Sequence, residues 1–275
     1  MRIFVINLKR SIDRKNIFQK NWHFISKRIE FFEAVDGNDL SENELSKIAL
    51  HYPSLKLTKG EIGCALSHLA IYKKIVKEDI PMALILEDDA ILNNKISHQQ
   101  IFDLLAKLEN LTSLPKNALI FLQNGAKTPL NENAFICQLT PTHSIEEMQS
   151  VWLSHAYVVS FEAAQKLSQF LLPIRYEADF WEALRVGTGI RLLAVRPAVI
   201  ESSDPLFETS SLHKDRLPLA SEREKIRGKL LEKEFELRKL RAQFKLFPIN
   251  RFFARNKFFP VNRFIRNLLI SFRKY

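Results

Sequence analysis

The stretch Met82-Ala83-Leu84-Ile85-Leu86-Glu87-Asp88-Asp89-Ala90 decides how this chain folds. Its apolar half predicts a short strand that is buried on both faces, as in the middle of a parallel sheet. The three carboxylates that follow cannot share that core, because burying an unpaired charge is too costly. We therefore expect them at the carboxyl end of the strand, where open α/β sheets bind ligands. Hard oxygen ligands at that edge suggest a divalent cation, which commonly accompanies a phosphate.

The spacing inside the acidic triplet allows two interpretations. Side chains alternate along a strand, so Glu87 and Asp89 would share one face and Asp88 would point to the other. Curvature of the chain beyond the strand could then bring two carboxylates onto one ion. A solvated acidic loop is the plainer alternative, because such triplets are common, and the spacing alone does not choose between them.

Predicted strands and helices alternate on both sides of this strand. The expected strands are 3–8, 29–34, 82–86, 118–122, 134–139, 156–160, 192–195 and 198–200. The expected helices are 59–77, 97–111 and 161–170, with a further helix start at a capping box formed by Ser41 and Glu44. This alternation predicts an α/β sandwich with a mostly parallel central sheet.

Composition narrows the class of protein. A chain of 275 residues can bury one large core, or one core plus an appendage. Cys64 and Cys137 are its two cysteines and form no CxxC pair, which argues against a disulfide framework or structural zinc. With a strand-like run at the start, no signal-peptide pattern and no membrane-length apolar run, we expect a cytoplasmic protein.

The net charge of +10 is concentrated at one end of the chain. Residues 241–275 hold nine Lys or Arg and no Asp or Glu, which leaves 32 basic against 31 acidic residues elsewhere. Phenylalanines such as Phe252 and Phe253 interleave with the basic residues. We expect a folded domain over 1–220, then a charged helical segment and a basic aromatic tail over 221–275. Such a tail suits an anionic membrane surface, although it could instead pack on the body or dimerise.

Three further segments could contribute to a site. Gly60 and Gly63 lie at a predicted helix start, where glycine lets another chain segment or a ligand approach the backbone. Arg10 and Arg14 follow the first strand and have the planar fork that suits phosphate, although a solvated first helical turn explains them equally well. The segment 175–182 mixes acids with aromatics, which suits a sugar or an ordinary helix N-terminus.

Taken in order, these segments resemble glycosyltransferase family 25, which includes bacterial lipooligosaccharide galactosyltransferases and the collagen galactosyltransferases. The resemblance spans roughly residues 3–200. It is carried by Phe4-Val5-Ile6-Asn7-Leu8-Lys9-Arg10 with Arg14, Phe32-Glu33-Ala34-Val35-Asp36-Gly37, Gly60-Glu61-Ile62-Gly63-Cys64-Ala65-Leu66-Ser67-His68, Ile85-Leu86-Glu87-Asp88-Asp89, Ser154-His155-Ala156-Tyr157-Val158-Val159-Ser160 and Glu177-Ala178-Asp179. It implies a glycosyltransferase-A-type nucleotide-binding fold with a basic helical C-terminal extension.

The resemblance also implies roles for individual residues. Asp89 and Glu87 would hold Mn²⁺ or Mg²⁺ on the diphosphate of a UDP-sugar, with Asp88 or Glu87 on the ribose or a second metal position. Asp179 would be the base that deprotonates the acceptor hydroxyl, with Glu177 as second choice. The remaining donor-binding candidates are Asn7, Leu8, Arg10, Arg14, Ala34, Asp36, Gly60, Gly63, Ser67 and His68. A late metal ligand stays open among Glu201, Asp204 and His213.

The function that the resemblance implies is an inverting, metal-dependent transfer of a hexose, with galactose in β linkage expected. The donor would be UDP-galactose, and the acceptor a lipopolysaccharide or lipooligosaccharide met at the inner membrane surface through residues 241–275. The alternative from another class is a nucleic-acid-binding protein, suggested by the basic aromatic tail. The nearly neutral body argues against that alternative, so no nucleic-acid partner is expected.

Overall fold

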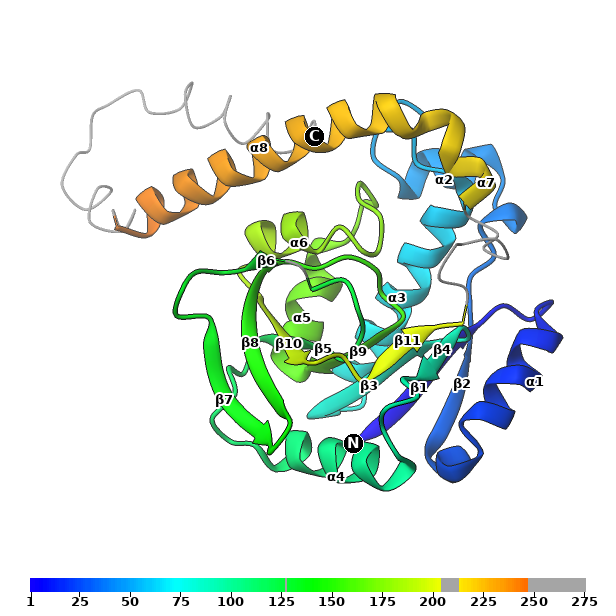
Figure 1. The fold of residues 1–275 in the computed structure, drawn as a ribbon. Coiled ribbons are helices and arrows are strands. Elements are labelled where there is room, and N and C mark those ends of the chain that lie inside the picture. The colour runs from blue at the N-terminus through cyan, green and yellow to red at the C-terminus, as the bar shows by residue number, and fades with distance from the viewer. Residues whose placement is uncertain (127, 204–212, 247–275) are drawn as a thin grey trace.

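The computed structural model describes residues 1–126, 128–203 and 213–246 (Figure 1). A mixed sheet has the strand order β2-β1-β3-β9-β5-β10-β8-β6, and β7 pairs with β8 beside it. Its strands are β1 (Arg2–Asn7), β2 (Ile29–Glu33), β3 (Met82–Glu87), β5 (Ala118–Phe121), β6 (Thr128–Pro129), β7 (Phe135–Thr140), β8 (His143–Ser150), β9 (Ala156–Ser160) and β10 (Arg191–Arg196). A separate two-stranded ribbon joins β4 (Ala90–Leu92) to β11 (Ile200–Ser202).

Most strands at the centre of the sheet run in one direction. β1 pairs in parallel with β2 and β3, and β5 pairs in parallel with β10. β9 lies between β3 and β5 and runs antiparallel to both. The prediction of an α/β fold with a mostly parallel central sheet is therefore confirmed, with β9 as the reversed strand and antiparallel pairing on the β8 side.

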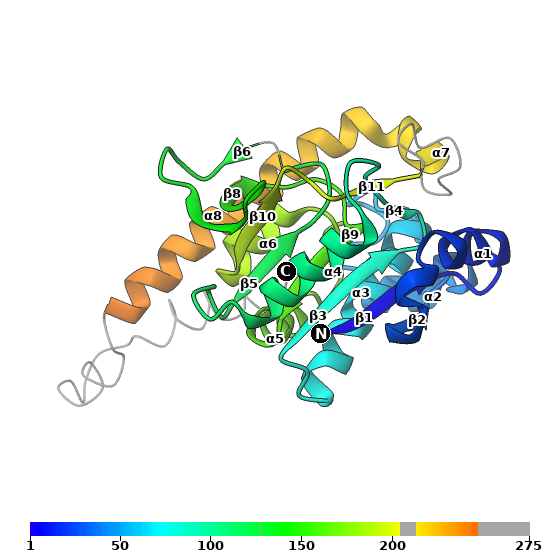
Figure 2. The ribbon, with the colours of Figure 1, turned by 60° about the horizontal axis from the view of Figure 1, so that its bottom comes forward.

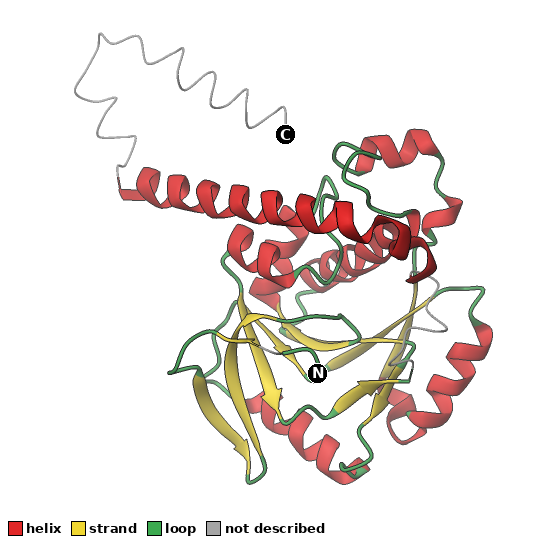
Figure 3. Ribbon diagram, turned by 45° about the horizontal axis from the view of Figure 1, so that its top comes forward, coloured by secondary structure: helices red, strands yellow, loops and turns green. Residues whose placement is uncertain are grey.

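Helices cover both faces of the sheet, as Figures 2 and 3 show. The described α-helices are α1 (Ile12–Asn21), α2 (Glu42–Ile48), α3 (Lys59–Lys77), α4 (His98–Asn110), α5 (Phe161–Phe170), α6 (Trp181–Thr188), α7 (His213–Arg216) and α8 (Ala220–Leu246). Short 3₁₀ turns lie at His23–Arg28, Gly37–Asp39 and Leu217–Leu219.

The alternation along β3 builds two cores. Ala83 and Ile85 belong to the core that contains residues of α3, α5 and α6. Leu84 and Leu86 belong to the core on the other face, with residues of α1 and α4. Because β3 is buried on both faces, its chain can become polar only where the strand ends, and this places the acidic triplet at the edge of the sheet.

Capping residues set the starts of several helices where the sequence predicts them. Ser41 and Glu44 form the expected capping box at α2, and Thr58 and Glu61 form one at α3. The predicted helix 59–77 matches α3 at both ends, because its apolar periodicity and its cap agree.

The predicted charged helix near residues 221–246 corresponds to α8, which packs on α6 (Figure 1). Two of its charged residues, Arg223 and Glu234, are buried. Residues 247–275 of the basic aromatic tail lie outside the described residues, so the expectation of membrane docking stays a prediction. Within the described residues, no helix combines the length and apolar character needed to cross a bilayer.

Candidate active site

The acidic triplet lies at the carboxyl end of β3, as the sequence predicts. β3 ends at Glu87, Asp88 and Asp89 form a turn, and β4 begins at Ala90. β11 runs beside β4, and the backbone N–H of Ser203 donates to the carbonyl oxygen of Asp89 at 2.8 Å. Two sheets therefore meet at this turn and fix its backbone.

Each of the three carboxylates has different partners. Glu87 accepts a hydrogen bond from Ser154 Oγ at 2.5 Å. Asp88 accepts from Asn7 Nδ2 at 2.7 Å and from the guanidinium of Arg14. Asp89 accepts from Ser202 Oγ at 2.9 Å. Asp88 is thus tied to the end of β1 and to α1, whereas Glu87 and Asp89 contact other segments, in keeping with the predicted alternation.

The start of α3 packs directly against the segment that follows β2. A Cβ atom at Gly63 would lie 2.6 Å from both the Gly37 nitrogen and the Val35 carbonyl oxygen. Ser67 Oγ strengthens this contact, because it accepts from the Val35 N–H at 2.8 Å and donates to the Gly63 carbonyl. Glycine at this helix start could allow either a ligand or another chain segment to approach the backbone. At Gly63 it allows the close approach of another chain segment.

These segments surround a cavity of about 260 Å³. The cavity collects residues from β1, the β2–α3 region, the end of β3, the start of β9 and the α6 and α7 regions. Its lining consists of Ile6, Leu8, Arg10, Ser11, Arg14, Ala34, Val35, Asp36, Gly37, Asn38, Gly60, Glu61, Cys64, Ser67, Glu87, Asp88, Asp89, Leu153, Ser154, His155, Ala178, Asp179, Ser202, Asp215 and Arg216.

Most residues that the sequence singles out lie in this lining, and four do not. The four are Asn7, which donates to Asp88, Gly63 in the helix contact, His68 behind Glu87, and Glu177. The fold brings the remaining candidates, which lie between 2 and 171 positions from Leu8 in the sequence, to one cavity. Among the late metal-ligand candidates, Glu201 accepts from Asn93 and is absent from the lining, and Asp204 and the His213 side chain lie outside the described residues.

Asp179 and Glu177 lie in different environments although they are two positions apart. Asp179 lines the cavity, and burial raises its pKa, an effect that the charge of Arg216 only partly offsets. Glu177 is buried and forms ion pairs with Arg223 and Arg227. Burial alone would raise the pKa of Glu177, but the two guanidinium groups hold it below the usual value. A raised pKa in a cavity is typical of a general base, whereas a paired carboxylate is typical of a structural ion pair.

The Asp89 carboxylate has the features of a cation ligand. Burial, and then the charge of Glu87, raises the pKa of Asp89 to about 6. Its Oδ1 atom is buried and has no hydrogen-bond partner within the described parts of the chain. A bound cation would reduce the repulsion between the Glu87 and Asp89 carboxylates and would give the buried Oδ1 atom a partner. Carboxylate oxygens are the hard ligands that Mg²⁺ and Mn²⁺ prefer.

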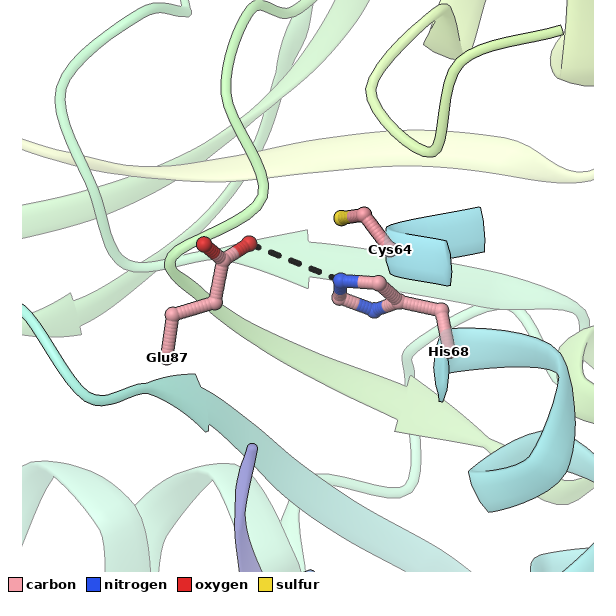
Figure 4. Close-up of side chains that lie close together, drawn as sticks. All are labelled: Cys64, His68 and Glu87. Carbon is pink, nitrogen blue, oxygen red and sulfur yellow. Dashed lines mark ion pairs between the residues drawn. The ribbon is translucent and has the colours of Figure 1, made fainter. Parts of the chain in front are cut away.

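A second group of potential ligands lies beside Glu87. One ligand atom each from Cys64, His68 and Glu87 falls within 4.8 Å of the others, and Figure 4 shows the His68 ring facing Glu87. His68 Nε2 is 3.5 Å from Glu87 Oε1, and its Nδ1 is 2.6 Å from the Tyr157 hydroxyl. Burial raises the pKa of the Cys64 thiol well above its usual value, which disfavours the thiolate that metal binding needs. The donor set of this group therefore fits a hard cation less well than Asp89 does.

Arginines from the C-terminal helices reach this site, and sequence analysis missed them. Arg216 lines the cavity and donates to Glu61 at 2.6 Å, and Arg223 donates to the same Glu61 oxygen at 2.5 Å. Arg227 pairs with Glu177. In the sequence these residues belong to a long charged run, which is typical of a solvated helix, so no local signal distinguishes them.

The chain is similar in sequence to several known proteins. A model of glycosyltransferase family 25, described as an LPS biosynthesis protein, matches residues 1–181 of the 275. Human procollagen galactosyltransferase 2 is 30% identical over 174 residues, which cover 60% of this chain and 27% of that protein. A procollagen lysyl hydroxylase and glycosyltransferase of Acanthamoeba polyphaga mimivirus is 29% identical over 244 residues, covering 76% of this chain and 26% of that protein. A bovine protein named probable inactive glycosyltransferase 25 family member 3 is 30% identical over 239 residues, which cover 76% of this chain and 39% of that protein.

The α/β fold and the cavity at the sheet edge thus occur in a chain that is similar to named glycosyltransferases. The chain belongs to glycosyltransferase family 25, because the family model matches more than half of its residues. The chain spans about a quarter of the length of these relatives: its match covers 27% of human and 27% of mouse procollagen galactosyltransferase 2.

Proposed function

We propose that this chain transfers a hexose, in the first instance galactose, from a UDP-sugar to an acceptor hydroxyl with inversion at the anomeric carbon. The observation that carries the proposal is the charge of the cavity. Seven carboxylates and three arginines line it among the described residues, namely Asp36, Glu61, Glu87, Asp88, Asp89, Asp179 and Asp215 against Arg10, Arg14 and Arg216. A diphosphate alone would be repelled by this surplus of negative charge, whereas a diphosphate with a divalent cation would be neutralised in part.

In this proposal Asp89 and Glu87 hold Mn²⁺ or Mg²⁺. The cation would stabilise the negative charge that develops on the departing UDP. Asp88 stays paired with Arg14 and orients the β1–α1 connection toward the donor, and Arg216 places a positive charge beside the diphosphate. Leu8, Ala34 and Asp36 lie where the nucleoside would bind, and Gly60 and Ser67 form the adjoining wall.

Asp179 is the proposed base. It accepts the proton of the acceptor hydroxyl as that oxygen attacks the anomeric carbon, and the bond from that carbon to the diphosphate oxygen breaks as UDP leaves. Its position in the lining and its raised pKa support this role over Glu177, which is held by two arginines.

The donor is tested by measuring UDP release from UDP-galactose, UDP-glucose and UDP-N-acetylglucosamine with Mn²⁺, with Mg²⁺ and with EDTA. We expect the fastest release from UDP-galactose and none with EDTA. UDP with Mn²⁺ should also raise the unfolding temperature, because a ligand at 100 times its Kd stabilises the folded state by about 2.7 kcal/mol. A chain that neither releases nor binds UDP under any of these conditions would contradict the proposal.

The acceptor is proposed to be a lipopolysaccharide or lipooligosaccharide, and the family description as an LPS biosynthesis protein supports it. The names of the relatives instead favour a collagen-type protein acceptor. UDP-galactose with a radiolabelled galactose moiety, offered with both acceptors, distinguishes the two. Label in lipooligosaccharide supports the proposal, and label in a hydroxylysine peptide alone contradicts it.

We also propose that the chain acts in the cytoplasm at the inner membrane, with 1–220 as catalytic domain and 221–275 as the helical and membrane-associating part. The nine basic residues and interleaved phenylalanines of 241–275 support this, since each basic residue near an anionic surface contributes about 1 kcal/mol. Removing residues 241–275 should abolish co-sedimentation with phosphatidylglycerol vesicles and preserve UDP release. Unchanged co-sedimentation refutes the membrane role, and tight binding to single-stranded DNA without UDP affinity would favour the nucleic-acid alternative.

A further inference from the structure

A second cavity of about 160 Å³ lies next to the first, between α8, the start of α6 and the segment before β9. It is smaller than the roughly 300–1,000 Å³ of typical ligand pockets, which favours a single small ring over a large ligand. Its lining combines aromatic, acidic and basic side chains. They are Ser150, Val151, Trp152, Asp179, Phe180, Trp181, Glu182, Glu224, Arg227, Gly228 and Leu231.

Asp179 lines both cavities, so the proposed base lies at their boundary. Two chain segments also pass from one cavity to the other. The segment 152–155 contributes Trp152 to the second cavity and its next three residues to the first. The segment 178–182 contributes Ala178 to the first cavity and its last three residues to the second. A molecule in the second cavity would therefore face the donor across Asp179.

Trp152 offers an exposed aromatic face on a fixed backbone. Its residue surface is 45% exposed, although Trp side chains are usually mostly buried. The Trp152 backbone N–H donates to the Gly125 carbonyl oxygen at 3.1 Å, and the Trp152 carbonyl oxygen accepts from Gln123 Nε2 at 2.9 Å. Gly125 has a φ of +109°, and a Cβ there would lie 2.4 Å from the Trp152 carbonyl oxygen. These contacts thus fix the Trp152 backbone, while nearly half of the residue surface stays open to solvent.

The turn after Trp152 is strained in a way that separates the two cavities. Leu153 has a φ of +70°, in the left-handed region that a branched side chain rarely adopts. The Trp181 indole Nε1 donates to the Leu153 carbonyl at 2.7 Å and secures this conformation. Strained backbone held by specific contacts is typical of functional sites. At this turn, the conformation of Leu153 lets Trp152 line the second cavity while Leu153 lines the first.

Gly228 leaves the α8 side of the cavity open. Glycine inside a helix is destabilising relative to alanine, so a mid-helix glycine usually has a packing or functional reason. A Cβ at Gly228 would meet no atom within 4 Å, so close packing of the described residues does not explain it. Because Gly228 lines the cavity, the space that its missing side chain leaves belongs to the cavity.

We propose that this second cavity binds the sugar ring of the acceptor, with Trp152 stacked on the ring and Glu182 and Glu224 accepting from its hydroxyls. Aromatic faces attract C–H edges, and carboxylates accept from hydroxyl groups, so the lining matches a polyhydroxylated ring. Arg227 lies over the Trp152 and Phe180 rings and pairs with Glu177, which positions the platform. This assignment rests on the proposed function, because it takes Asp179 as the base between donor and acceptor.

Saturation-transfer NMR with methyl β-D-galactopyranoside and methyl β-D-glucopyranoside tests the assignment on the full chain, with and without UDP and Mn²⁺. We expect the ring protons of at least one glycoside to be saturated by the wild type. Trp152→Ala and Gly228→Leu should each weaken this binding about tenfold or more, by removing the platform or filling the space, and Trp152→Phe should restore part of it. UDP affinity, measured in parallel by titration, should be the same in all variants.

Matched controls separate a lost site from a misfolded chain. Phe235→Ala removes an exposed aromatic side chain of α8 that does not line the cavity. Lys229→Leu adds the same leucine one position along α8, also outside the lining. Both should bind the glycosides as the wild type does. Glycoside binding that survives Trp152→Ala and Gly228→Leu, or that is absent from the wild type, overturns the assignment. Failure to bind UDP overturns the proposed donor site instead, and the two readouts are independent.

Discussion

Asp89→Asn should reduce UDP-sugar turnover by roughly a thousandfold or more, because a bound cation supplies several kcal/mol to the transition state. The amide cannot replace a carboxylate as a ligand of comparable charge. In the absence of metal, Asp89→Asn should be at least as stable as the wild type. The raised pKa of Asp89 means that the folded state disfavours its charged form, so the wild type should lose stability as pH rises through about 6. The variant should not show this loss.

The matched control for this prediction is Asp103→Asn. Asp103 is exposed on α4 and bonds to Gln99, so the same change removes a charge far from the cavity lining. We expect wild-type turnover and a wild-type gain in unfolding temperature with Mn²⁺ and UDP. In Asp89→Asn that thermal gain should be lost. A variant that keeps both the gain and the turnover would exclude Asp89 as a metal ligand.

Asp179→Asn should lower transfer by about 10²–10⁴-fold, the usual contribution of a general base, while UDP affinity stays the same. Burial raises the pKa of Asp179, so its charged form is disfavoured in the fold and the neutral amide should not destabilise the chain. In the wild type, transfer should fall with decreasing pH through this raised pKa, because the base must be deprotonated. Full transfer by Asp179→Asn would remove it as the base.

Glu177→Gln is the comparison that makes the Asp179 result specific. Removing one partner from a buried ion pair costs about 3–5 kcal/mol, and Glu177 is paired with both Arg223 and Arg227. We therefore expect a lower unfolding temperature in Glu177→Gln, with residual transfer in the fraction that stays folded. Urea unfolding and initial transfer rates, measured on both variants, show whether the two acids differ as their environments suggest.

The fold could be predicted best where local signals agreed. α3 combines apolar periodicity with a capping box, and β3 is an apolar run that ends in charge, so both were placed correctly. β8 was missed because Glu146 and Glu147 interrupt the apolar pattern of a strand, although its Ile145 and Met148 are buried. β9 has the composition of a central strand, and nothing in that composition indicates its reversed direction.

The candidate site was predictable where its residues follow strand ends. Glu87, Asp88 and Asp89 lie at such an end, and sheet geometry brings Leu8 and Asp36 to the same edge. The contribution of α8 was not predictable, because the buried Arg223 pairs with Glu61 and Glu177, which are 162 and 46 positions away. Contacts over such separations leave no periodic pattern in the sequence. The same applies to Trp152, whose backbone is held by Gly125 and Gln123.

The position of Mn²⁺ in crystals of the chain grown with UDP and MnCl₂, read from anomalous scattering, tests the proposed metal site most directly. We expect a peak within coordination distance of the Asp89 carboxylate and of the UDP diphosphate, in the cavity that Arg216 and Asp179 also line. A peak held by Cys64 and His68 without Asp89, or UDP bound with no metal contact to the acidic triplet, would contradict it.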